Sequence, residues 1–140
     1  TILLGRKLAE GFIPYWTAAY LSPEPEEGAE IFVATPKVVF TKTLMTSIWE
    51  NTVLAKGELA TEVNGLKQRE GNDMIAYGGG QFVSSLIKDC LIDELHLFIN
   101  PTILGSGMSI FQTVIEKQHY KCVNVQLFDC GIVVLNYKLI

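Results

Sequence analysis

The sequence is poor in the residue types that mark metal-binding and disulfide-bonded proteins. It has only three cysteines, Cys90, Cys122 and Cys130, and two histidines, His96 and His119. None of these residues stands at a metal-ligand spacing. We therefore predict no metal site, and we interpret the cysteines as buried, reduced thiols of a cytoplasmic protein.

Long apolar runs and an excess of positive charge are also missing. No run reaches the roughly eighteen residues of a membrane-spanning helix. The net charge of −4 argues against a nucleic-acid surface, which is normally basic. Hydrophobic residues make up 49% of the 140 residues, which suits a folded protein with one core. We expect residues 1–140 to form one domain that binds neither a membrane nor a nucleic acid.

A glycine-rich turn is the most informative feature that the sequence does have. The apolar run Met74–Tyr77 stops at Gly78, Gly79 and Gly80, and a helical pattern follows over Gln81–Leu91. A strand, a glycine turn and a helix in this order present free backbone N–H groups at a helix N-terminus, where anions such as phosphates bind. The alternative is a tight connection with no ligand, since short loops between strand and helix are common.

The two best-known phosphate-binding motifs do not match this turn. A Walker loop continues with Gly-Lys-Ser/Thr, whereas Gly80 is followed by Gln81 and Phe82. A dinucleotide-binding fingerprint has a third glycine or alanine where Val83 stands. A nucleotide at this turn would therefore bind in some other way.

Strand and helix patterns alternate along the middle of the chain. This predicts an α/β fold in one domain, with a mixed, mostly parallel sheet flanked by helices and an antiparallel hairpin at the C-terminus. Five side chains should be buried: Leu66, Leu86, Leu95, Leu97 and Ile99. The predicted strands are Thr1–Leu4, Lys37–Lys42, Thr52–Ala55, Met74–Tyr77, Glu94–Asn100, Lys121–Phe128 and Ile132–Leu139. The predicted helices are Leu8–Trp16 (broken at Pro14), Ala29–Thr35, Leu59–Glu70 (capped by Gly71) and Gln81–Leu91.

Three separated segments together resemble a known family. They are Leu4–Lys7 (LGRK), Val38–Lys42 (VVFTK) and the glycine turn with Leu91–Leu95 (LIDEL) and Asn100–Gly107 (NPTILGSG). Over Leu4–Tyr137 the chain resembles the C-terminal reductase domain of the riboflavin-biosynthesis deaminase–reductases, which has the dihydrofolate-reductase-like fold. The resemblance implies a homodimer that binds NADPH and reduces a pyrimidine or pterin-like small molecule by hydride transfer.

The resemblance also implies which residues bind the cofactor. The loop that begins the first helix would meet the cofactor phosphates, the pair after the next strand would face the 2′-phosphate, and the glycine loop would lie under the pyrophosphate. The peptide bond between the first two glycines would be cis. The implied residues are Gly5, Arg6 and Lys7; Thr41 and Lys42; and Gly78, Gly79, Gly80, Gln81, Phe82 and Val83.

The sequence departs from the family in two ways. Leu8 stands where the family often has a threonine that donates to phosphate, and Ala9 stands where it commonly has an aromatic residue. The family's first strand would lie before Thr1, so we predict a gap in the sheet, or a strand from elsewhere, where that strand should pair. No residue of this chain can be named as the catalytic acid. The alternative function is a non-catalytic dimeric relative that keeps the fold and binds a nucleotide without turnover.

Overall fold

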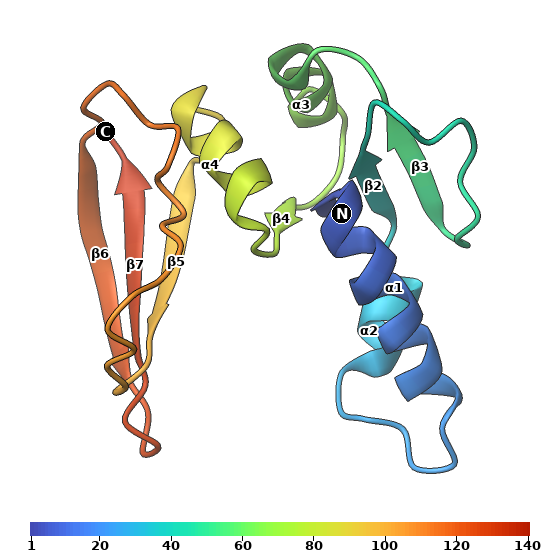
Figure 1. The fold of residues 1–140 in the computed structure, drawn as a ribbon, viewed down its shortest axis with the longest axis horizontal. Coiled ribbons are helices and arrows are strands. Elements are labelled where there is room, and N and C mark those ends of the chain that lie inside the picture. Colours follow the sequence, from blue (N-terminus) through green and yellow to red (C-terminus); the bar gives the residue numbers. More distant parts are fainter.

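The computed structural model describes all of residues 1–140 and contains two separate sheets (Figure 1). The first is parallel, with strand order β3-β2-β1-β4, and the second is antiparallel, with order β5-β7-β6. No helix is long and apolar enough to cross a membrane. The strands are β1 (Ile2–Gly5), β2 (Lys37–Phe40), β3 (Thr52–Ala55), β4 (Ile75–Ala76), β5 (Glu94–Ile99), β6 (Tyr120–Leu127) and β7 (Val133–Leu139). The helices are α1 (Arg6–Leu21), α2 (Ala29–Ala34), α3 (Leu59–Lys67) and α4 (Gly80–Lys88).

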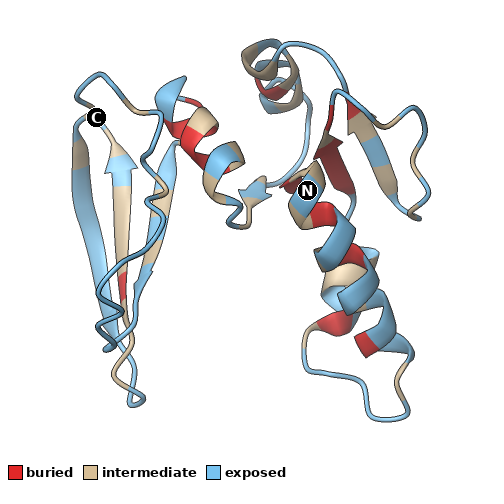
Figure 2. Ribbon diagram, in the orientation of Figure 1, coloured by how far each residue is buried: buried red, intermediate tan, exposed pale blue.

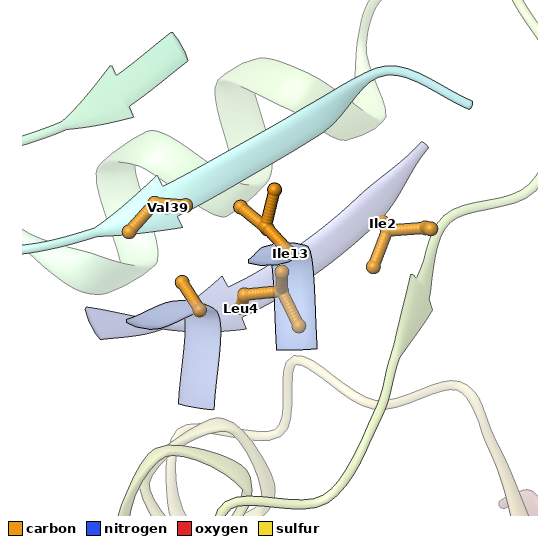
Figure 3. Packing of buried hydrophobic residues seen from close by; sticks show 5 residues of the cluster. Ile2, Leu4, Ile13 and Val39 are labelled. Carbon is orange, nitrogen blue, oxygen red and sulfur yellow. The ribbon is translucent and has the colours of Figure 1, made fainter. Parts of the chain in front are cut away.

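The parallel sheet contains the main core of the protein. Ile2 and Leu4 of β1 and Val39 of β2 pack against Ala9 and Ile13 of α1 (Figure 3). Leu4 and Val39 are fully buried. These strands are short runs of β-branched and aliphatic residues, as expected for strands covered on both faces.

The fold is α/β as predicted, but the predicted single mixed sheet is wrong, because β2 and β4 lie in the parallel sheet and β5 lies in the antiparallel one. Strand β4 is an edge of the parallel sheet and β5 is an edge of the antiparallel sheet, so the chain passes from one sheet to the other between them. Helix α4 and residues 89–93 connect the two sheets (Figure 1). Val63 of α3, Leu86 of α4 and Leu91 form the buried cluster at this connection.

The predicted helices formed with two differences at proline and glycine. Helix α1 continues through Pro14 rather than breaking there. Pro14 is exposed, so the carbonyl that its ring leaves without a partner, one turn earlier, can be solvated. Helix α3 ends at Lys67 with Gln68 as its cap, before Gly71, whose φ of 153° does not make the predicted left-handed cap.

Burial in the antiparallel sheet is lower than predicted. Leu86 is buried and Leu66, Leu95 and Leu97 are half-buried, but Ile99 is 49% exposed. The prediction for Ile99 is wrong because nothing covers this end of β5. The cysteines are free, as predicted, but all three are exposed rather than buried: Cys90, Cys122 and Cys130.

Candidate functional site

Two helix N-termini lie side by side at the carboxyl edge of the parallel sheet. Strand β1 pairs with β4 in parallel, with Ile2 opposite Ile75 and Leu3 opposite Ala76. Gly5 follows Leu3 by two residues and Gly78 follows Ala76 by two residues, so both glycines lie at this edge of the sheet. Helix α1 begins directly after Gly5, and α4 begins directly after Gly79. The sheet therefore brings together the first and third of the predicted site segments.

Neither of these helix N-termini is closed by a side chain. No side-chain cap is present at Gly5 or at Gly79. The first N–H groups of a helix have no partner within the helix, so those of α1 and α4 are available to an external acceptor. Both helix dipoles also place partial positive charge at this position. An anion is the group that this pair of termini would stabilise.

The glycine turn achieves its shape by left-handed backbone conformations. Gly78 has a φ of 43° and Gly79 a φ of 77°, and both residues are exposed. The structure contains no cis peptide bond, so the predicted cis bond between Gly78 and Gly79 is wrong. Two successive positive φ values reverse the chain here with trans peptides, and glycine adopts them without steric cost.

The space around the turn is limited by Leu8 and Phe82. A Cβ added to Gly79 would lie 3.8 Å from Leu8 Cδ2, in ordinary contact with the first turn of α1. A Cβ added to Gly5 would lie 3.0 Å from Phe82 Cβ, which is closer than side chains normally approach. Gly5 therefore allows α4 to pack closely on β1. Phe82 is half-buried and Val83 is buried, so these two predicted site residues could offer only backbone groups to a ligand.

The polar side chains near these two helix N-termini differ in whether they are free to bind an anion. Arg6 Nη1 forms an ion pair of 2.6 Å with Glu10 Oε1, one turn along α1. Lys7 is exposed. Gln81 is also exposed, at the second position of α4. An anion at the termini could recruit Lys7 directly and Arg6 by exchange with Glu10.

The predicted pair Thr41 and Lys42 lies at the same edge of the sheet, after β2, and is engaged with the protein itself. Thr41 is buried, and its Oγ1 accepts the N–H groups of Thr43 and Leu44 at 3.1 Å each. Lys42 Nζ donates to the carbonyl oxygens of Lys56, at 2.9 Å, and Gly57. The pair thus stabilises the loops after β2 and β3.

Sequence reasoning missed two carboxylates at the N-terminus of α3. Glu58 Oε2 accepts the Thr61 N–H at 2.8 Å, and Glu62 Oε1 accepts the Gly57 N–H at 2.8 Å. Hydrogen bonds from the backbone of Thr61 and Ala60 lower the pKa of Glu58. The signal was the acidic residue on each side of Leu59-Ala60-Thr61, at the start of a helical pattern.

An aromatic cluster connects a potential fluorescent reporter to the glycine turn. The rings of Trp16 and Phe32 are stacked with centroids 4.1 Å apart, and Phe32 lies 5.6 Å from Tyr77. Tyr77 immediately precedes Gly78. Because Trp16 and Tyr77 share this cluster, a change at the turn should alter tryptophan fluorescence.

The second glycine segment, Gly105–Gly107, lies in the long loop before β6 that contacts α4. Ser84 Oγ of α4 is fully buried and accepts the Thr113 N–H at 2.8 Å. A Cβ on Gly80 would lie 3.5 Å from Met108 Sδ in this loop. The loop therefore borders the glycine turn on one side.

Comparison with known proteins identifies the family. The fold is of the dihydrofolate-reductase-like type found in RibD proteins. Residues 1–134 match the RibD C-terminal domain, and the chain belongs to this family. It is 31% identical over 137 residues to the uncharacterized protein YyaP of Bacillus subtilis (strain 168), covering 98% of this chain and 72% of YyaP.

Solved structures support the same fold. A pyrimidine reductase-like protein from Corynebacterium diphtheriae superimposes with a TM-score of 0.66 at 13% identity, covering 100% of this chain and 75% of that one. The diaminohydroxyphosphoribosylaminopyrimidine deaminase/5-amino-6-(5-phosphoribosylamino)uracil reductase of Thermotoga maritima gives a TM-score of 0.67 at 18% identity, covering 99% of this chain and 45% of that one. These identities are too low to transfer an activity, so they bear on fold alone.

Proposed function

We propose that this domain is a reductase that binds a reduced nicotinamide dinucleotide and transfers hydride to a pyrimidine or pterin-like small molecule. Membership of the RibD C-terminal domain family supports the reaction class. The observation that carries the proposal is the pair of uncapped helix N-termini at α1 and α4, on neighbouring parallel strands. The resemblance implies NADPH, and the choice between NADPH and NADH depends on the residues after β2 and β3.

The residues present fit the diphosphate of such a cofactor. The N–H groups of Gly80, Gln81 and Phe82 would bind one phosphate, and the first N–H groups of α1 would bind the other. Hydrogen bonds to a charged oxygen contribute about 1.5–3 kcal/mol each, so a few suffice for a micromolar site. Lys7 and Arg6 would add charge. When bound, the nicotinamide supplies the hydride.

The test is a titration of tryptophan fluorescence with NADPH and NADH in two matched glycine variants. Gly79 and Gly28 are both N-cap residues of a helix with a left-handed φ, of 77° and 84°. A Cβ on either would lie at similar distances from a neighbouring side chain, 3.8 Å from Leu8 and 3.7 Å from Phe32. Gly79→Ala and Gly28→Ala should therefore cost similar stability, about 1–2 kcal/mol each.

Only Gly79→Ala should affect the cofactor, because its methyl group would stand at the N-cap of α4 and contact Leu8 in the first turn of α1. We expect at least a tenfold loss of affinity in Gly79→Ala, about 1.4 kcal/mol, and none in Gly28→Ala. If both variants bind as the wild type does, or if the wild type binds neither dinucleotide, the proposal is wrong.

A non-catalytic relative that binds a nucleotide is the second candidate function. The observation that favours it is Leu8, an apolar side chain beside Gly79 where the family often has a threonine. A domain of this kind would bind the dinucleotide without consuming it. Loss of absorbance at 340 nm with pyrimidine or pterin substrates would exclude this candidate.

We also propose that the protein forms a homodimer through the antiparallel sheet. Strand β6 is an edge strand with three exposed apolar side chains, Val123, Val125 and Leu127, at 47%, 59% and 72%. A second copy would remove this surface from water. Light scattering at micromolar concentration should give twice the mass of 15.5 kDa, and Leu127→Lys should return the monomer. A monomeric wild type would overturn this proposal.

A further inference from the structure

We infer that the dinucleotide bound by this chain carries no 2′-phosphate, so that NADH is preferred to NADPH. The inference rests on the proposed function and concerns the half of the same site that would hold the adenosine. It depends on which hydrogen-bond donors at the carboxyl edge of the sheet are free and which are already used.

The order of the strands determines where the adenosine must lie. The diphosphate belongs at β1 and β4, and β2 and β3 follow beyond β1 on the same side. Neighbouring strands are about 4.8 Å apart, so the end of β3 is roughly 10 Å from the end of β1. This is about the reach of an adenosine from its phosphate. Its ribose would therefore lie over the loops that follow β2 and β3.

Several donors in these two loops are already used within the protein. Thr41 Oγ1 accepts two backbone N–H groups, and Glu62 and Glu58 accept those of Gly57 and Thr61. Lys42 Nζ donates to two carbonyl oxygens, and Lys56 Nζ donates to the carbonyl of Met45 at 2.6 Å. A 2′-phosphate needs several donors and would compete with these bonds for them.

The charges of the loops also oppose a phosphate. Two carboxylates, those of Glu58 and Glu62, occupy the N-terminus of α3, which is the position where a phosphate would otherwise bind. They offset the charges of Lys42 and Lys56, so no net positive charge is left for a phosphate dianion. A ribose 2′-hydroxyl, in contrast, can donate a hydrogen bond to a carboxylate. The carboxylates of Glu58 and Glu62 thus occupy the anion-binding position at the N-terminus of α3, whereas no side chain caps the N-termini of α1 and α4.

The experiment compares NADH with NADPH by tryptophan fluorescence, and ADP-ribose with 2′-phospho-ADP-ribose by calorimetry. The wild type should bind the form without 2′-phosphate at least about tenfold more tightly in both pairs, because like charges repel in a partly desolvated site. The calorimetric pair lacks the reactive ring and does not depend on turnover. Equal or tighter binding of the 2′-phosphorylated forms would overturn the inference and leave the proposed function intact. If no dinucleotide binds, the inference and the proposed function both fail.

Charge variants locate the cause of the preference. Glu58→Gln and Glu62→Gln keep an oxygen acceptor for the capped N–H group but remove the negative charge, so each should reduce the preference for NADH several-fold. The matched control is Glu30→Gln, which removes an acidic side chain from the first turn of α2, before β2 rather than after it. It should leave the ratio of affinities unchanged. An unchanged ratio in both Glu58→Gln and Glu62→Gln would contradict the role given to the carboxylates.

Lys42→Met separates the two roles open to this lysine. If Lys42 only stabilises the loops, the variant should lower the melting temperature and reduce the affinity for NADH and for NADPH by the same factor. A loss confined to NADPH would mean that Lys42 binds the 2′-phosphate, and this result would overturn the inference.

Discussion

The parallel and antiparallel sheets of this domain differ sharply in how much of their surface is covered. The core of the protein lies around the parallel sheet and α4, while Val134 is the only buried residue of β5, β6 and β7 (Figure 2). An apolar hollow of about 380 Å³ is lined by Leu95, Leu97 and Tyr137 of the antiparallel sheet, by Ile87 of α4 and by the loop before β6. The parallel sheet thus supports the candidate site with a packed core, whereas the antiparallel sheet leaves most of its apolar surface exposed.

The two sheets should differ most in how much stability is lost when a leucine is replaced by alanine. Leu4 is fully buried in β1, and Leu127 in β6 is 72% exposed. Leu4→Ala should lower the free energy of unfolding by about 2–5 kcal/mol, because it leaves a cavity in a packed core. Leu127→Ala should change it by less than about 0.5 kcal/mol in the monomer. Chemical denaturation at concentrations that dissociate any dimer would measure both values.

Equal losses in these two leucine variants would contradict the comparison. They would mean that the antiparallel sheet is packed as tightly as the parallel one. A loss in Leu127→Ala that appears only at high protein concentration would instead support the proposed dimer.

A smaller effect is expected at the ion pair that joins the two parts of the domain. Lys67 of α3 contacts both carboxylate oxygens of Asp93, just before β5, at 2.8 and 2.6 Å. The Asp93 side chain is 73% exposed, so solvent screens the pair. Asp93→Asn should cost no more than about 1 kcal/mol, and less in high salt. A salt-independent loss in thermal denaturation would show that the pair is more than a surface contact.

The smallest effects concern one carboxylate in each part of the domain. Backbone N–H groups lower the pKa of Glu58, whereas the Lys138 ammonium lowers the pKa of Glu94. A lowered folded-state pKa gives stability that is present above the unfolded pKa, near 4.3, and is lost as the pH falls through the folded pKa. Glu58→Gln and Glu94→Gln should each destabilise the protein at pH 7 and have little effect near pH 3.

Salt should distinguish these two carboxylates. Molar salt should weaken the effect of Glu94→Gln, since its cause is an exposed ion pair, and leave that of Glu58→Gln nearly unchanged. Denaturation curves at pH 7 and pH 3, with and without salt, would test this. The same salt response in both variants would contradict the assigned causes.

The sequence predicted the strands of both sheets, including the antiparallel pair β6 and β7, but not how far the antiparallel sheet is covered. Short aliphatic strands such as β2 and the helix after Gly79 depend on local pattern, and they formed within a few residues of their predicted limits. The split between β4 and β5 was not predicted, because the sequence indicated one sheet that contains both strands. The exposure of Ile99 and of the cysteines could not be predicted, because it depends on which tertiary contacts form.

The candidate site was also predictable only in part. The glycine turn and the helix that follows are local in sequence, and so is the pair Thr41 and Lys42. The hydrogen bonds of Lys42 could not be predicted from the local sequence, because its partners are the carbonyl oxygens of Lys56 and Gly57, which follow a different strand. The predicted backbone conformation of the turn was wrong. The turn contains two glycines with left-handed φ values and no cis peptide bond.

Amide hydrogen exchange with and without a saturating dinucleotide tests the central claim most directly. The claim is that the N-termini of α1 and α4, on the parallel sheet, hold the diphosphate. We predict that NADH slows exchange at Arg6–Leu8 and Gly79–Phe82 and leaves β5, β6 and β7 unchanged. Protection confined to the antiparallel sheet, or binding that leaves both helix N-termini exchanging at their original rate, would contradict it.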